Sequence, residues 1–278
     1  MKKLKPMISF LTVIAGGYLF ILVLMFLFQN NLLFMPTSGL IQTPQSAGVD
    51  AEDFWVETAD GVRIHGWYFP KDGAEFVVVL SHGNAGNISY RINIASTLLE
   101  TGASVLMYDY RGYGQSEGRP NERGLYRDIE AVVEGLKNEK GYAENQIVMY
   151  GRSLGGAVAA YAGTKYNLGG LVLDSAFTDL RAMVRDVYPF IPSRLARYEF
   201  PTNRYVQYSR NYPIMIMHSP NDEIVRYHHG RELYELLDEP KRFVELRGGH
   251  NDNFFASRDI ILKNWKWYLN ELNTHSGI

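Results

Sequence analysis

Residues 146–156, which read Gln-Ile-Val-Met-Tyr-Gly-Arg-Ser-Leu-Gly-Gly, restrict the possible folds of this chain more than any other stretch. Five strand-forming, mostly apolar residues lead into a Gly-X-Ser-X-Gly pattern, and small residues typical of a closely packed helix follow it. The pattern places Ser153 on a sharp, strained turn between a strand and a helix, with its hydroxyl projecting above the sheet. Gly151 and Gly155 are required because a side chain at either position would crowd the turn. The stretch predicts a nucleophilic serine; the alternative is a glycine-rich turn with an inactive one.

A nucleophilic serine also needs N–H donors for the oxyanion that forms on its substrate. The helix predicted to begin at Leu154 points its first N–H groups toward the site. A second donor is expected from residues 81–87, Ser-His-Gly-Asn-Ala-Gly-Asn, in the loop after the third predicted strand. We predict the N–H of Asn84 as that donor. The loop lacks the Gly-Lys-Ser/Thr ending of a nucleotide-binding loop, which disfavours a phosphate cradle.

Strand-like and helix-like segments alternate along most of the chain. Continuous apolar runs, typical of parallel strands buried on both faces, occur at 76–80, 103–108, 146–150, 170–173 and 213–217. Two β-prone runs flank Asp60-Gly61, which predicts an antiparallel hairpin, and residues 242–246 predict a last strand. Helices are expected at 88–100, 125–137 and 258–272. This alternation predicts an α/β fold with a mostly parallel, eight-stranded sheet flanked by helices.

One long interval, about 176–212, breaks the alternation. It is rich in tyrosine and phenylalanine, and three prolines interrupt any long helix. An insertion of this length predicts a small cap over the carboxyl ends of the strands. Its aromatic side chains either line an acyl or aryl pocket or form the core of the cap itself.

The N-terminus predicts a membrane anchor. Residues 7–28 carry no charge and are numerous enough to cross the hydrocarbon core of a bilayer. A cleaved signal peptide is the alternative, but its apolar segment is usually shorter. We therefore predict a cytoplasmic tip and transmembrane anchor at 1–30, a linker at 31–52 and one catalytic domain at 53–278.

The charges beside this segment predict its orientation. Lys2, Lys3 and Lys5 precede it, and the next basic residue is Arg63. The positive-inside rule then places the N-terminus in the cytoplasm and the domain on the extracytoplasmic side. Without these three lysines the chain has 25 basic and 30 acidic residues, and the domain has no run of basic residues. Nucleic acid is therefore not an expected partner.

A serine nucleophile needs a base, and the base needs an acid that orients it. His250 follows the last predicted strand in a glycine-rich loop, which makes it the expected base. Asp222 lies just past the preceding strand and is the expected acid, in competition with Glu223 and Asp174. The chain order Ser, Asp, His is the order found in folds with this serine turn.

Four motifs in register support a resemblance to a known family. They are Ser-His-Gly-Asn-Ala-Gly-Asn at 81–87, Asp-Tyr-Arg-Gly-Tyr-Gly-Gln-Ser at 109–116, Gly-Arg-Ser-Leu-Gly-Gly at 151–156 and Gly-Gly-His-Asn-Asp at 248–252. From about residue 54 to 272 the chain resembles the membrane-anchored serine hydrolases of the α/β-hydrolase superfamily that include the fungal bud-emergence proteins and their bacterial relatives. Mammalian members of this branch remove palmitoyl groups from cysteine thioesters.

The resemblance implies Ser153 as nucleophile, Asp222 as acid and His250 as base. Around the acid the family commonly reads His-Gly-X-X-Asp, whereas this chain has Ser219 in place of the glycine. The Asp keeps its position, so this departure concerns the local turn. Asp109 and Arg111 we assign to the structure of their loop.

The expected activity is cleavage of esters or thioesters of small-molecule or lipid-like acyl substrates near a membrane. A serine peptidase of the same fold and a non-catalytic, membrane-tethered binding module are the alternatives. The chain has no cysteine, no His-Glu-X-X-His motif and no local cluster of histidines and carboxylates, so no metal or cofactor is expected. The sequence carries no signal for an oligomeric state.

Overall fold

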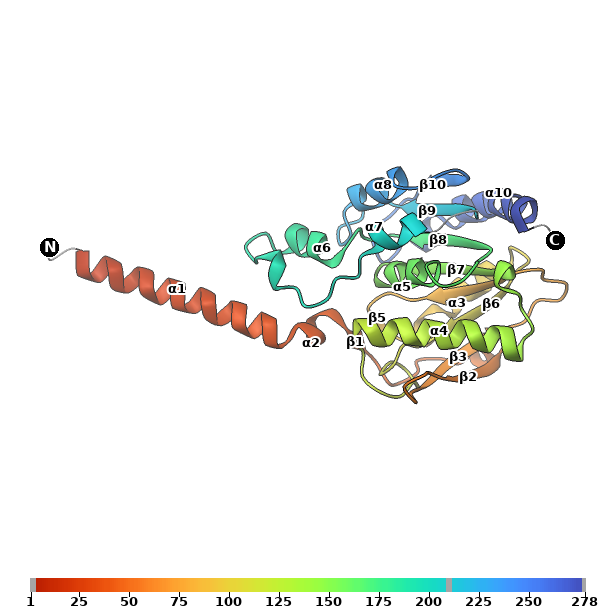
Figure 1. Cartoon of the computed structure of the whole chain (residues 1–278), viewed down its shortest axis with the longest axis horizontal. Helices are drawn as coiled ribbons and strands as arrows, with labels where there is room; N and C mark the ends of the chain where they lie inside the picture. Colours follow the sequence, from red (N-terminus) through yellow and green to blue (C-terminus); the bar gives the residue numbers. More distant parts are fainter. Residues whose placement is uncertain (1–3, 209–211, 277–278) are drawn as a thin grey trace.

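The computed structural model describes residues 4–208 and 212–276, and its core is one eight-stranded sheet (Figure 1). The strand order is β10-β9-β8-β7-β4-β6-β3-β2. The strands are β2 (Glu52–Glu57), β3 (Arg63–Phe69), β4 (Val77–Ser81), β6 (Ser104–Tyr108), β7 (Ile147–Arg152), β8 (Gly170–Asp174), β9 (Ile214–His218) and β10 (Lys241–Glu245). β3 pairs antiparallel with both β2 and β6, and every other neighbouring pair is parallel. The predicted hairpin and the mostly parallel sheet are confirmed.

Helices cover both faces of the sheet. They are α3 (Ile92–Leu99), α4 (Glu122–Glu139), α5 (Leu154–Ala162), α8 (Tyr227–Glu235), α9 (Asn253–Ala256) and α10 (Arg258–Ser276). Single-turn 3-10 helices lie at η1 (Gln45–Ala47), η2 (Ile88–Arg91) and η3 (Glu144–Gln146). Val77 and Val79 of β4 pack on the side of α4, α5 and α8, whereas Val78 and Leu80 pack on the side of α3 and α10. Because successive side chains of a strand point to opposite faces, the continuous apolar runs of the sequence fill two cores.

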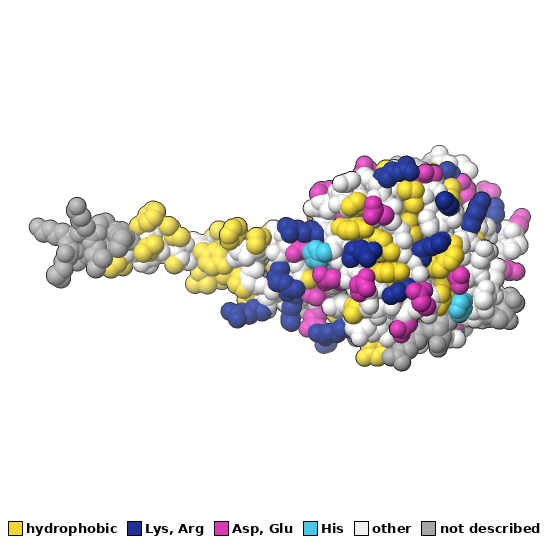
Figure 2. Space-filling model, turned by 90° about the horizontal axis from the view of Figure 1, so that it is seen from above, with side chains coloured by type: hydrophobic (Ala, Val, Ile, Leu, Met, Phe, Trp, Pro, Cys, Tyr) yellow, Lys and Arg dark blue, Asp and Glu magenta, His cyan; other side chains and the backbone are white. Residues whose placement is uncertain are grey.

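The N-terminal helix α1 (Leu4–Leu27) projects away from the domain (Figure 1). From Ile8 onward most of its apolar side chains are exposed, as the space-filling view shows (Figure 2). Its segment Ile8–Leu27 is long and apolar enough to cross a membrane, and none of it is buried inside the protein. Lys2 and Lys3, on which the predicted orientation depends, lie outside the described residues.

The segment predicted as a linker, 31–52, lies against the domain. After α2 (Gln29–Leu33), the two-residue strand β1 (Met35–Pro36) pairs in parallel with β5 (Ala85–Gly86) in the loop that follows β4. Phe34 is only 2% exposed. The segment that follows α1 and α2 is thus joined to the loop predicted to hold an oxyanion donor. The missing periodicity of the sequence could not show this pairing.

The interval between β8 and β9 holds short helical pieces: α6 (Leu180–Val187), η4 (Ser193–Leu195), α7 (Thr202–Tyr205) and η5 (Val206–Tyr208). Its aromatic side chains divide into two groups. Phe200 is fully buried and packs with Tyr205 around Tyr126 of α4, so these rings form a core. Tyr188 and Phe190 are instead exposed at the tip beside α1.

Candidate active site

Ser153 lies at the turn between β7 and α5, with a left-handed φ of 52° and ψ of −117°. A Cβ atom at Gly155 would lie 2.0 Å from the carbonyl oxygen of Ser81, and one at Gly151 would lie 2.4 Å from the carbonyl oxygen of Gly155. Neither contact is possible, because both partners are backbone atoms of closely packed elements. The glycine spacing in the sequence therefore reflects two separate close approaches around the serine.

His250 and Asp222 form a hydrogen-bonded pair. Nδ1 of His250 lies 2.7 Å from Oδ2 of Asp222, and both side chains are buried. Oδ1 of Asp222 accepts hydrogen bonds from the backbone N–H groups of Ile224, at 3.0 Å, and Val225, at 2.8 Å. An ionised carboxylate is acceptor-only, so the proton of the neutral imidazole lies on Nδ1 and Nε2 is left free to act as a base.

The charge state of Asp222 suits this role. Burial disfavours the carboxylate, but the hydrogen bond to His250, the charge of that ring when it is protonated and the N–H of Val225 outweigh the burial. The pKa of Asp222 therefore lies below its ordinary value. The acid remains ionised at neutral pH and can stabilise a positively charged imidazolium ring.

The two rival carboxylates are used elsewhere. Oε2 of Glu223 accepts a hydrogen bond from the backbone N–H of His250, at 2.9 Å. Asp174 is fully buried and accepts hydrogen bonds from Tyr150, at 2.8 Å, and from Arg152, at 2.5 Å. Of the three candidates, Asp222 is the one whose carboxylate bonds to the imidazole.

Arg152, the residue just before the serine, connects three parts of the site. Its guanidinium forms the ion pair with Asp174 and donates to Oδ1 of Asn253 at 3.0 Å. It also donates to the carbonyl oxygen of His250, so it fastens the loop of the base to the serine turn. Sequence reasoning did not single out Arg152. A charged residue at the end of a buried parallel strand was the signal that could have found it, because such a charge needs a partner.

Ser219, the departure from the family pattern, joins the loop of the acid to the loop of the base. Its hydroxyl donates to the carbonyl oxygen of Gly248 at 2.5 Å and accepts from the N–H of Asn221 at 3.1 Å. A glycine could make neither bond. The departure thus adds a contact between the two loops that carry Asp222 and His250.

The loop with Asn84 is held from both sides. The carbonyl oxygen of Asn84 accepts from the N–H of Met35, at 3.0 Å, and from the hydroxyl of Tyr113, at 2.8 Å. Its side-chain amide donates to the carbonyl oxygen of Leu33 at 3.0 Å. On the other side of the turn, α5 begins at Leu154, and the first N–H groups of a helix have no partner within it. Asn84 and Leu154 stay our predicted oxyanion donors.

One pocket of about 280 Å³ brings the predicted residues together. Ser153, His250, Asn84 and Leu154 all line it, and Asp222 lies behind His250. The cap contributes apolar walls through Leu180 and other residues, and the segment after α1 contributes through Leu33. Residues from six distant parts of the sequence thus line the pocket that holds Ser153.

Asp109 and Arg111 support the surrounding loops, in keeping with their predicted assignment. Oδ1 of Asp109 accepts from the N–H of Ile88 at 2.9 Å. Arg111 forms ion pairs with Asp60 and with the buried Asp128.

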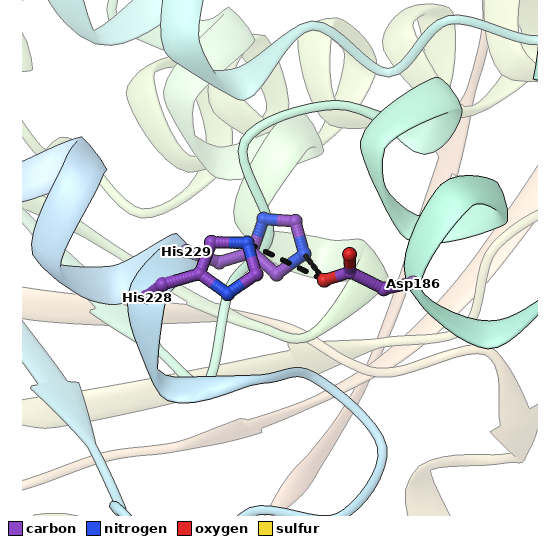
Figure 3. A group of neighbouring side chains, drawn as sticks. All are labelled: Asp186, His228 and His229. Carbon is purple, nitrogen blue, oxygen red and sulfur yellow. Dashed lines mark ion pairs between the residues drawn. The ribbon is translucent and has the colours of Figure 1, made fainter. Parts of the chain in front are cut away.

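Asp186, His228 and His229 form a second cluster, which local spacing in the sequence could not reveal (Figure 3). Oδ2 of Asp186 lies 3.3 Å from Nε2 of His228 and 3.2 Å from Nε2 of His229. Such a set of atoms is able to hold a metal ion. However, Nδ1 of His229 accepts from the backbone N–H of Thr178, so the proton of the neutral ring lies on Nε2 and faces Asp186. We therefore interpret this cluster as a contact that ties α6 of the cap to α8.

Comparisons with known proteins agree with this fold. Residues 73–208 match the family described as serine aminopeptidase, S33. The uncharacterized protein Rv2307c of Mycobacterium tuberculosis is 34% identical over 272 residues, which cover 96% of this chain and 95% of that protein. The uncharacterized membrane protein YNL320W of Saccharomyces cerevisiae is 32% identical, over 84% of this chain and 87% of the relative. Among solved structures, the Pyrococcus furiosus esterase Pf2001 superposes with a TM-score of 0.69 at 21% identity, covering 87% of this chain and 97% of its own.

Proposed function

Because the chain belongs to the α/β-hydrolase family, we propose that it is a serine hydrolase that cleaves carboxylic esters or thioesters through an acyl-enzyme on Ser153. The observation that carries the proposal is the bond between His250 and Asp222 beside a pocket that also holds Ser153. That bond leaves Nε2 of His250 as a base on the side of the ring away from the acid.

The proposed reaction has two halves. Nε2 of His250 accepts the proton of the Ser153 hydroxyl as Oγ attacks the carbonyl carbon of the substrate. The N–H groups of Leu154 and Asn84 bind the resulting oxyanion, and His250 then returns the proton to the leaving alcohol or thiol. In the second half His250 activates a water molecule that releases the acid from Ser153.

The position of the enzyme is part of the proposal. The exposed apolar helix α1 would anchor the chain in a membrane, with the domain on the extracytoplasmic side. One relative carries the words membrane protein in its name, which supports anchoring. A reporter fused to the C-terminus tests the orientation, and activity of a cytoplasm-specific reporter there would contradict it.

A serine peptidase is the second candidate, because the matched family is described as an aminopeptidase. Recognition of the positively charged N-terminus of a peptide calls for an anionic group near the serine. Among the described residues that line the pocket there is no carboxylate, which favours the esterase proposal.

The test compares butyrate esters, butyryl thioesters and an aminoacyl amide with the full chain and Ser153→Ala. We expect ester and thioester turnover that the substitution abolishes, with amide turnover at least about 100-fold slower. Faster amide turnover would favour the peptidase. A folded wild-type chain inactive on all three would support the non-catalytic binding module.

A further inference from the structure

An apolar groove of about 130 Å³ runs between the end of the N-terminal helices and the cap. Leu22, Met25 and Phe26 of α1 form one wall, and Val184 and Ile191 of the cap form the other. The described residues that line the groove include no charged side chain. A groove of this composition binds hydrocarbon in preference to polar groups.

Hydrogen bonds hold the two walls in place. The side-chain amide of Gln29 donates to the carbonyl oxygen of Leu195 at 2.8 Å, and its oxygen accepts from the N–H of Arg197 at 2.8 Å. The hydroxyl of Tyr198 donates to Oδ1 of Asn30 at 2.6 Å. The groove is therefore defined by direct bonds between anchor and cap.

The groove adjoins the catalytic pocket. Leu33 and Leu180 line both of them, one from the anchor side and one from the cap. The groove and the pocket that holds Ser153 therefore share part of their walls.

The tip of the cap lies alongside the middle of α1. The hydroxyl of Tyr18 donates to the carbonyl oxygen of Phe190 at 2.5 Å, and the Phe190 side chain is 84% exposed. Tyr18 precedes Leu27, the end of α1, by nine residues, or about 14 Å of helix. If α1 spans a bilayer, the tip and the outer part of the groove lie at the depth of the acyl chains.

The catalytic pocket also carries a cation. Arg91 lines it, and its guanidinium donates to the carbonyl oxygens of Asn87 and Ala85, at 2.5 and 2.6 Å. Burial lowers the pKa of Arg91 to about 10, so it remains charged at neutral pH. The described lining of this pocket includes no carboxylate, and the charges that act on Arg91 are those of Asp109 and Arg152. A guanidinium at this place suits a phosphate on the substrate.

We propose that this groove binds the acyl chain of a phosphate-bearing membrane lipid, drawn sideways from the bilayer, and presents its ester bond to Ser153. The inference rests on the proposed function and adds the substrate class and its route. It explains why the segment after the anchor pairs, through β1, with the loop that holds Asn84 and is not a free linker.

The first experiment blocks the groove. The assay measures hydrolysis of p-nitrophenyl butyrate and p-nitrophenyl palmitate by the full chain in detergent micelles. It compares the wild type with Val184→Trp and with the matched control Arg185→Trp, on the exposed side of α6. We expect the palmitate-to-butyrate ratio of kcat/KM to fall at least tenfold in Val184→Trp and less than twofold in the control. Ile191→Trp repeats the test at the other end of the cap wall, in case Val184→Trp does not fold. An unchanged ratio in folded groove variants would overturn the proposal.

The second experiment identifies the source of the chain. The full chain is placed in vesicles of a dialkyl-ether phosphatidylcholine, which has no ester bond to cleave, and the vesicles contain a phosphatidylglycerol, a diacylglycerol or an S-palmitoyl peptide with matched, isotopically labelled chains. We expect fatty acid release from the phosphatidylglycerol to be at least tenfold faster than from the other two. Faster release from the peptide would overturn the assignment to a lipid.

These results separate the two levels of the argument. Butyrate turnover that depends on Ser153, together with an unaltered chain-length ratio, refutes only the groove. Absence of all turnover refutes the proposed function and, with it, the groove.

Discussion

Replacement of Asp222 by asparagine tests the assignment of the acid. Oδ1 of Asp222 accepts two backbone N–H bonds, from Ile224 and Val225. The amide oxygen of the asparagine will keep that position, because turning the amide round would set its N–H₂ group against two donors and lose two hydrogen bonds, at about 1 kcal/mol each. The N–H₂ group then faces Nδ1 of His250 and donates to it.

The consequence is the wrong tautomer of His250. With Nδ1 accepting, the ring proton moves to Nε2, and His250 can no longer take the proton of Ser153. For the corresponding change in a well-studied serine protease the loss is about 10⁴-fold in kcat. We expect a loss of about 10³- to 10⁴-fold here, or about 4–5 kcal/mol of transition-state stabilisation.

The assay is kcat/KM for p-nitrophenyl butyrate, with folding checked by thermal melting. Glu223→Gln is the matched control, since Glu223 bonds to the backbone of His250 and not to its ring. We expect that variant to keep at least about a tenth of the activity. If Asp222→Asn kept more than a tenth, or if Glu223→Gln lost more than Asp222→Asn, the assignment of the acid would be wrong.

Three further predictions concern other parts of the molecule. Gly155→Ala places a Cβ 2.0 Å from the carbonyl oxygen of Ser81, so we expect a loss of about 3 kcal/mol in the free energy of unfolding, measured by urea titration; an unchanged midpoint would contradict the close approach. Hydrogen bonds from Arg111 hold the pKa of Asp60 below its ordinary value, so Asp60 stabilises the fold at neutral pH and this contribution is lost as the pH falls below about 4. Because Asp60 is exposed and solvent screens its ion pairs, Asp60→Asn should cost about 0.5–1 kcal/mol at pH 7 and progressively less below pH 4, and a cost independent of pH would refute the linkage. Phe190→Asp, at the exposed tip of the cap, should slow hydrolysis of vesicle lipid at least fivefold and leave hydrolysis of soluble butyrate ester intact; equal effects on both substrates would argue against a tip in the membrane.

The fold was predictable because its signals are local. Buried parallel strands must be apolar on both faces, so β4 and β6 to β9 appear in the sequence as continuous apolar runs. The turn at Ser153 was predictable for the same reason, since two close backbone contacts require glycines at 151 and 155. In the structure the ring of His250 bonds to Asp222 and not to the side chains of Glu223 or Asp174, a difference that spacing alone could not show.

Contacts between distant segments were not predictable in this way. Residues 31–52 lack periodicity, and only the fold shows that β1 pairs with the loop of Asn84. The role of Arg152 depends on partners 22 and 101 residues away, and the cluster of Asp186 with His229 joins two separate helices. Pairings of this kind arise from tertiary packing and leave no pattern in the sequence.

The central claim is that Ser153 is an activated nucleophile. The most direct test is reaction of the full chain, in detergent, with a fluorophosphonate probe, with Ser153→Ala beside the wild type. We predict covalent labelling of the wild type at Ser153, found by mass spectrometry of the labelled peptide, and none in the variant. A folded wild-type chain that stays unlabelled, or equal labelling of the variant, would contradict the account.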